Sequence, residues 1–288
     1  MPTSDTIALI FDFDDTLAPD STTLLLKKHG IDAKKFWGTE FKSLMESGYD
    51  PPLAYLKLIL DKTGQGRPLG HLTNKDLRTF GSSLDSHFMT GIPQIFRDLK
   101  KMVARTEGIQ IEFYIISGGL REIIIGSKIV RDNFKEVYGC EFEEGGNPAR
   151  ICGIKRAVSF TEKTRYIFEI NKGLAQASTR KNPYQVNQEI PEGKRRILFE
   201  NMIYVGDGLT DIPCFSLVKK LGGTPFGVFD PGDPVNAKKA LLDFLRPKRV
   251  ISMHAPRYGP KGELGALLRA AVSNLCGQIV VRRQAAER

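Results

Sequence analysis

The sequence predicts an α/β protein, with a doubly wound, Rossmann-like parallel sheet as its core and a mainly α-helical cap insertion. Two observations carry this prediction. Short apolar runs recur along the chain with helical patterns between most of them, as in a parallel sheet with crossover helices. The stretch 20–90, in contrast, has helical periodicity and no strand pattern. A length of 288 residues suits one large domain with an insertion better than several independent domains.

The expected strands have the Val, Ile, Leu and Phe content of buried parallel strands. Ligand-binding residues are expected where these strands end, because open parallel sheets bind ligands at their carboxyl edge. The five runs are Ile7–Phe11, Ile111–Ile116, Met202–Val205, Phe226–Phe229 and Val250–Met253.

Residues 20–90 are predicted to form a helical cap domain, and 1–19 with 91–288 the core domain. Because the insertion follows the first strand, we expect it to hang over the carboxyl edge of the sheet. Its helical segments are separated by the breakers GYDPP and GQGRPLG, and a further helix leads to the second strand. The segments are Phe36–Ser47, Pro52–Lys62, Lys75–Phe88 and Ile92–Val103.

Four other segments complete the pattern. The SGG that follows Ile116 is predicted to be a turn, and Tyr138–Phe160 a β-hairpin. Gly173–Arg196 is polar and basic, which indicates a helix end followed by a surface loop. Lys261–Val281 has an amphipathic pattern, for which packing on the core is the safer interpretation and a self-association face the alternative.

The bulk composition is that of an ordinary soluble protein, with 41% hydrophobic and 26% charged residues. We find no apolar stretch of about 18 residues or more that would span a membrane. Met1–Thr6 lacks the form of a signal peptide. A cytoplasmic protein with no membrane partner is therefore expected.

The net charge of +9 favours anionic ligands such as phosphorylated metabolites, although a solvated basic surface explains it equally well. No basic run is interleaved with aromatic residues, so no nucleic-acid partner is expected. The cysteines form no CxxC pair, which predicts free thiols rather than a zinc site or a disulfide framework. They are Cys140, Cys152, Cys214 and Cys276.

Asp12 and Asp14 follow the first strand in the run IALIFDFDDT. Two carboxylates crowded at the end of a buried strand repel each other unless a cation or a proton lies between them. Oxygen ligands at such a strand end suit Mg²⁺. The sequence therefore predicts a magnesium site at this edge of the sheet.

Polar groups follow two further strands in order, as Ser117-Gly-Gly and as Gly206-Asp207-Gly-Leu-Thr-Asp211, and Lys163 begins a helix before the third strand. This ordered set resembles the haloacid-dehalogenase-like (HAD) superfamily, over a core that runs from Ile7 to about Met253. The resemblance implies phosphoryl transfer with Mg²⁺ as cofactor.

In this interpretation Asp12 attacks phosphorus and Asp14 acts first as general acid and then as general base. The metal ligands would be the Asp12 carboxylate, the Asp14 backbone carbonyl and Asp207. Asp211 would hold a metal-bound water or orient Lys163. The phosphoryl group would be bound by Thr16, Ser117, Gly118 and Lys163.

Taken singly, these residues have simpler interpretations: an aspartate often caps a helix or turn, and Ser117 could belong to a mere turn. Lys163 could be a solvated helix residue, and Lys172 competes for its role. Asp15 stands where many HAD relatives have glycine, and its function is left open. The second acid, Asp14, argues for phosphatase or phosphomutase chemistry rather than dehalogenase chemistry.

The insertion resembles the cap of small-molecule phosphatases, with phosphoserine phosphatase among them. We therefore expect a Mg²⁺-dependent phosphatase that hydrolyses a small phosphorylated metabolite through an aspartyl-phosphate. The alternatives are a phosphomutase or phosphotransferase of the same superfamily, and a non-catalytic basic binding protein. The sequence predicts neither the metabolite nor the oligomeric state.

Overall fold

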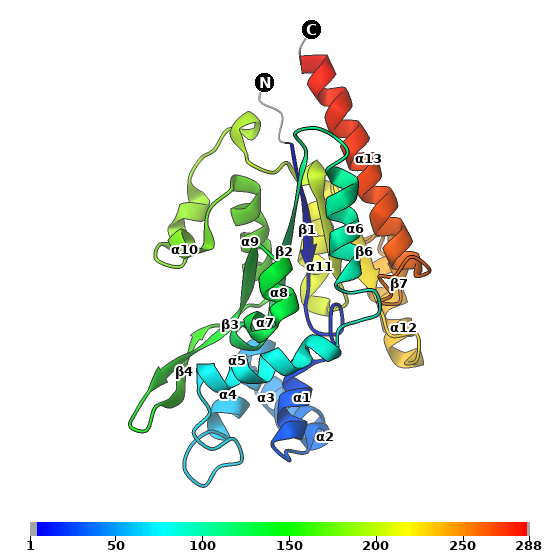
Figure 1. Cartoon of the computed structure of the whole chain (residues 1–288). Helices are drawn as coiled ribbons and strands as arrows, with labels where there is room; N and C mark the ends of the chain where they lie inside the picture. The colour runs from blue at the N-terminus through cyan, green and yellow to red at the C-terminus, as the bar shows by residue number, and fades with distance from the viewer. Residues whose placement is uncertain (1–4, 287–288) are drawn as a thin grey trace.

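The computed structural model describes residues 5–286. Its centre is a seven-stranded sheet of order β4-β3-β2-β1-β5-β6-β7, with helices packed around it (Figure 1). The strands are β1 (Thr6–Phe11), β2 (Gln110–Leu120), β3 (Glu136–Gly145), β4 (Arg150–Arg156), β5 (Met202–Gly206), β6 (Thr224–Val228) and β7 (Ser252–His254).

All neighbouring strands are parallel except β3 and β4, which pair as the antiparallel hairpin predicted within Tyr138–Phe160. β1 lies at the centre between β2 and β5, and every one of its residues is buried. The strand order reverses around β1, since the chain builds outward to β4 on one side and to β7 on the other. Such a switch point is where open α/β sheets bind ligands.

The structure corrects two predicted strand bounds, the end of β2 and the start of β7. β2 continues through Ser117-Gly-Gly to Leu120, so this segment is an irregular part of the strand, with a register shift against β3, rather than a turn. β7 is a short strand that starts at Ser252, two residues later than predicted. Val250 is buried beside it but does not pair.

Helices cover both faces of the sheet (Figure 1). α6 (Gln94–Val103) packs against β2 and against α13 (Glu263–Ala286), whereas α9 (Phe160–Lys172) and α11 (Ile212–Lys220) pack against each other on the opposite side. The core between β1 and α6 is aromatic. Phe11, Phe96 and Phe134 meet edge to face, with ring centroids 5.0 to 6.1 Å apart. This doubly wound arrangement confirms the predicted fold class.

Helices without strands fill the connection from β1 to α6 and lie beyond the carboxyl ends of the strands (Figure 1). This insertion packs tightly on the core, because a Cβ at Gly81 would lie 1.9 Å from the carbonyl oxygen of Ile123. The division into a cap at 20–90 and a core stays a prediction. The inserted helices are α1 (Ser21–Lys28), α2 (Ala33–Lys35), the π-helical turn Phe36–Phe41, α3 (Lys42–Glu46), α4 (Pro51–Asp61), α5 (Asn74–Ser82) and the 3₁₀ turn Ser83–Ser86.

The predicted surface loop Gly173–Arg196 is more ordered than expected. Gly173 has φ of 70° and ends α9 in the left-handed conformation that glycine adopts at helix ends. Short helices follow it in place of a plain loop. The remaining helices are α7 (Arg121–Gly126), α8 (Lys128–Asn133), α10 (Gln176–Thr179), α12 (Pro234–Ala240), and the short turns Pro183–Asn187, Glu192–Lys194, Phe199–Asn201, Leu209–Asp211 and Leu241–Leu245.

α13 is long and apolar enough to cross a membrane, with a mean hydropathy of 1.5 over its most apolar window. This corrects the expectation that the chain has no such stretch. Leu268, Val272 and Ile279 of this helix are nevertheless buried against the core, and Arg269 makes an ion pair of 2.7 Å with Asp98 of α6. The predicted packing of this segment on the core is therefore confirmed. The expectation about a signal segment rests partly on residues 1–4, which lie outside the described residues.

Candidate active site

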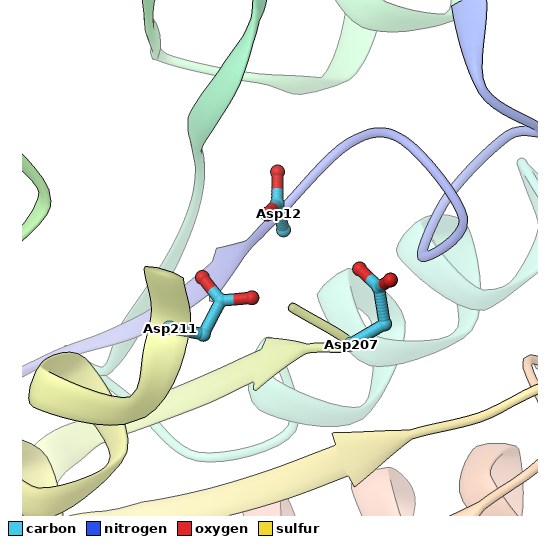
Figure 2. Close-up of side chains that lie close together, drawn as sticks. All are labelled: Asp12, Asp207 and Asp211. Atoms are coloured by element: carbon cyan, nitrogen blue, oxygen red, sulfur yellow. The ribbon is translucent and has the colours of Figure 1, made fainter. Parts of the chain in front are cut away.

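Three carboxylates converge at the carboxyl edge of the sheet (Figure 2). Asp12 follows β1, Asp207 follows β5, and Asp211 ends the short turn before α11. One ligand oxygen from each lies within 4.8 Å of the others. β1 and β5 are direct neighbours, with Phe11 opposite Val205, so their parallel pairing brings the two strand ends together.

Lys163 places a buried cation among these acids. It lies in the first turn of α9, and its Nζ donates to Oδ2 of Asp12 at 2.6 Å and to Oδ1 of Asp211 at 2.7 Å. Burial alone would lower the pKa of this ammonium, but the two carboxylates outweigh it and hold the pKa well above its ordinary value. Lys172, the competing lysine, instead donates to the backbone carbonyl groups of Val186 and Gln188.

Asp211 is fixed by its neighbours. Its Oδ1 accepts from the hydroxyl of Tyr204 at 2.6 Å as well as from Lys163, and its Oδ2 accepts from the amide of Gly208 at 3.0 Å. A Cβ at Gly206 would lie 2.5 Å from Oδ2, so only glycine leaves room for this carboxylate. Because both oxygens are engaged, Asp211 is better suited to hold Lys163 in place than to bind a metal.

Asp14 lies two residues beyond Asp12, in the loop after β1, and contacts the first residue of the insertion's helix α1. Its Oδ1 accepts from the backbone amide of Ser21 at 2.8 Å, and its Oδ2 faces Gly119, where a Cβ would lie only 2.4 Å away. Burial, and then the charge of Asp20, raises the pKa of Asp14 well above its ordinary value. A carboxyl group of this kind can carry a proton near neutral pH, as a general acid must.

The segment Ser117-Gly-Gly lies next to Asp14. The amide of Gly119 donates to Oγ of Ser117 at 3.0 Å. The carbonyl oxygen of Gly118 accepts from the hydroxyl of Tyr55, on α4 of the insertion, at 2.6 Å, and from the thiol of Cys140 at 3.2 Å. The insertion therefore contacts the predicted phosphate-binding segment directly.

Thr16 is buried, and its hydroxyl donates to Oδ1 of Asp207 at 3.0 Å. Its position therefore supports the metal-ligand candidate Asp207.

Asp15 has φ of 53°, and it lines a cleft of about 440 Å³ together with Asp207 and Asp230. Burial, and then the charge of Asp20, raises the pKa of Asp15 to about 6.

The donor set fits a hard divalent cation. The ammonium of Lys163 bonds to the carboxylates of Asp12 and Asp211, and one oxygen of Asp207 lies within 4.8 Å of theirs, so three acids share this cation. Burial, together with the charges of Asp12 and Asp211, raises the pKa of Asp207 well above its ordinary value. A buried acid whose charge is this poorly compensated is a suitable ligand for Mg²⁺, which prefers carboxylate oxygens.

Three contributors were not predicted from the sequence: Tyr204, Tyr55 and the backbone of Ser21. A tyrosine inside a buried strand needs a hydrogen-bond partner, which is the only sequence pattern that marks Tyr204. The sequence of the insertion offers five residues as possible substrate contacts, for which core or surface roles are the simpler interpretation. The structure gives several of them other partners: Trp37 donates to Thr23, Lys57 pairs with Asp61, and Arg78 pairs with Glu122. The five are Trp37, Phe41, Lys57, Arg67 and Arg78.

No family model matches the sequence. A curated protein of Borreliella burgdorferi, named as an uncharacterized protein, is 30% identical over an alignment of 238 residues that covers 75% of this chain and 79% of that protein. The chain and the Borreliella protein belong to one family.

Among solved structures, a HAD family hydrolase from Salmonella enterica subsp. enterica serovar Typhi superposes with a TM-score of 0.53 and 18% sequence identity. The chain has the HAD fold. The match covers 83% of this chain and 66% of the Salmonella hydrolase, which is just under two thirds of its length. A gene product of Archaeoglobus fulgidus reaches a TM-score of 0.43 at 12% identity, over 77% of this chain and 73% of its own, which is too low to support a structural argument. The predicted HAD fold is confirmed, and the phosphoserine-phosphatase-like branch stays a prediction.

Proposed function

We propose that this HAD-fold protein is a phosphatase that hydrolyses a small phosphomonoester through an aspartyl-phosphate on Asp12. The observation that supports it most is the buried bridge from Asp12 through Lys163 to Asp211. This bridge fixes the Asp12 carboxylate at the end of β1 through a hydrogen bond from the buried ammonium of Lys163. A structural ion pair would gain little from such burial, because desolvation offsets most of its Coulombic energy.

The chemistry follows from the positions of the two acids. One oxygen of Asp12 attacks phosphorus while the ester oxygen leaves and takes a proton from Asp14. Asp14, now ionised, removes a proton from water, whose oxygen attacks the same phosphorus. The bond between the Asp12 oxygen and phosphorus breaks, which releases inorganic phosphate and regenerates the free carboxylate. Lys163 and the hydroxyl and amide groups of Ser117 and Gly118 would offset the phosphoryl charge.

Asp12, Asp207 and the backbone carbonyl of Asp14 are proposed to hold Mg²⁺. When bound, the cation would neutralise phosphoryl oxygens and make phosphorus more electrophilic. Thr16 would orient Asp207 through the hydrogen bond described above, and Asp211 would keep Lys163 directed at Asp12.

The expected substrate is small because the helical insertion lies over the site and contacts the phosphate-binding segment through Tyr55. A cap of this kind excludes water and bulky esters. A phosphorylated metabolite of the cytoplasm fits this restriction and the positive net charge of the chain.

The test is phosphate release from an aryl phosphate and a panel of small phosphorylated metabolites, with Mg²⁺ and with chelator. Asp12→Asn should abolish release, whereas Asp61→Asn, which removes a half-exposed carboxylate on the insertion, should not. Release by Asp12→Asn at the wild-type rate would refute the proposal. Transfer of the phosphoryl group to a second hydroxyl, instead of to water, would replace the phosphatase by a phosphomutase.

A further inference from the structure

One surface outside the candidate site combines exposed aliphatic side chains with cations that form no ion pair within residues 5–286. It is formed by the end of α11 and by the chain from Leu241 to Ile251, on the β6–β7 side of the sheet (Figure 1). We call it the basic-apolar surface. It comprises Leu241, Leu245, Ile251, Lys220, Arg246 and Lys248.

Hydrogen bonds and ring packing hold the two segments together. Nζ of Lys219, one residue before the end of α11, donates to the carbonyl oxygens of Lys248 and Val250 at 2.6 and 3.1 Å. Phe215 of α11 packs edge to face against Phe244, with ring centroids 5.3 Å apart. The inward-facing phenylalanines thus fix the helix that carries the exposed leucines.

The exposed side chains of this surface are large. Leu241, Leu245 and Ile251 are 47%, 39% and 53% exposed. Each would gain from leaving water, because burial of aliphatic area is favourable by about 25 cal/mol per Å². Clustered apolar exposure on a folded chain indicates a contact site more often than scattered exposure does.

The charge of the same surface is strongly positive. The segments 219–222 and 241–251 contain five lysine and arginine residues and one carboxylate, Asp243. Lys220, Arg246 and Lys248 are exposed, and none of them makes an ion pair with any acid in residues 5–286. The cations are therefore available to an outside anion.

These two properties together select one kind of partner. A symmetric contact with a second copy would set the cations against their own equivalents, with a single acid to compensate, and like charges oppose such an interface. A nucleic acid would pair with the cations but leave the aliphatic side chains in water, since stacking uses aromatic residues. A membrane surface that carries anionic lipids accepts cations at its headgroups and aliphatic side chains just beneath them.

We propose that the basic-apolar surface binds the surface of a bilayer that contains anionic lipid, independently of the proposed phosphatase activity. This is a peripheral contact and involves no spanning segment, although it departs from the expectation of no membrane partner. α13 is not proposed as the contact, because its aliphatic side chains Leu268, Val272 and Ile279 are fully buried against the core.

The experiment is co-sedimentation of the full chain with phosphatidylcholine vesicles, with and without phosphatidylglycerol. We expect binding only to the anionic vesicles, weakened by added salt. Lys220→Ala/Arg246→Ala/Lys248→Ala should weaken binding on the order of a hundredfold, because each cation near an anionic surface contributes about fivefold. The matched control Lys34→Ala/Lys35→Ala/Lys181→Ala removes three exposed cations elsewhere and should bind nearly as the wild type does.

The apolar half is tested by Leu241→Ser/Leu245→Ser against Leu267→Ser/Val281→Ser, which alters exposed apolar residues of α13. Only the first pair should lose binding, and circular dichroism and thermal unfolding establish that all variants fold. Absence of binding to anionic vesicles at low salt would overturn the proposal. Loss of binding in the α13 pair alone, or a concentration-dependent dimer lost in the Leu241/Leu245 variant, would overturn it in favour of α13 or of a second copy.

Discussion

Gly119→Ala should separate the position of Asp14 from the stability of the fold. An alanine Cβ at this position would lie 2.4 Å from Oδ2 of Asp14, whereas ordinary contacts begin at 3.4 Å. The carboxylate must therefore move by about 1 Å. The amide of Ser21 holds its other oxygen at 2.8 Å and opposes that movement. Gly119 does not have a positive φ, so alanine adds no backbone strain there.

A misplacement of about 1 Å in a catalytic group costs roughly a hundredfold in rate, which corresponds to about 2.7 kcal/mol of transition-state stabilisation. We expect kcat for an aryl phosphate to fall by about that factor in Gly119→Ala. The melting temperature should change far less, because the atoms nearest to the new Cβ belong to the side chains of Asp14 and Ser117 and not to the backbone.

The assay is steady-state phosphate release with Mg²⁺, alongside thermal unfolding. Gly277→Ala is the matched control, since a Cβ there meets no atom within 4 Å. It lies in α13, far from the site, and should keep full activity while gaining up to about 1 kcal/mol of helix stability. A folded Gly119→Ala enzyme with unchanged kcat would refute the assignment of Asp14 as general acid.

Three further predictions follow from the same geometry. Tyr55→Phe removes a hydrogen bond to the carbonyl oxygen of Gly118, so KM for the ester should rise with little change in kcat. The free energy of unfolding should fall by about 1 kcal/mol. An unchanged KM would contradict the proposed contact between the insertion and the phosphate-binding segment. Lys163→Met leaves the carboxylates of Asp12 and Asp211 without their shared cation. The free energy of unfolding should therefore fall by about 3–5 kcal/mol, and activity should be lost. Retained activity would exclude the lysine from the active site. Folding raises the pKa of Asp15 to about 6 and that of Asp207 well above 3.8, so the folded state binds protons more tightly and the melting temperature of chelator-treated protein should rise as pH falls from 7 toward 5. Mg²⁺ should reduce this rise, and a melting temperature that only falls with acidification would contradict it.

Much of the site was predictable because its residues follow strands that are themselves easy to find. The runs before Asp12 and Asp207 are buried and mostly apolar, and neighbouring parallel strands end at one edge of the sheet. The choice of Lys163 over Lys172 could not be made from the sequence, because both lie on the same helix. Only the packing of α9 places the side chain of Lys163 between two carboxylates.

Other features depended on tertiary contacts. The Ser117-Gly-Gly segment reads as a turn, yet pairing with β3 continues beyond it to Leu120. Glycine was needed at Gly119 because Asp14 lies against it, not because the chain turns there. The hydroxyl of Tyr55 is far from the site in sequence, and no local pattern predicts its bond to Gly118.

The most direct test of the central claim is to look for the phosphoryl group on Asp12. Wild-type protein is mixed with an aryl phosphate and Mg²⁺, quenched in acid during turnover, and digested for peptide mass analysis. The account predicts one added phosphoryl group on the peptide that contains Asp12, absent from Asp12→Asn and present in Asp61→Asn. Phosphate release at full rate with the label on another residue, or undiminished release by Asp12→Asn, would contradict it.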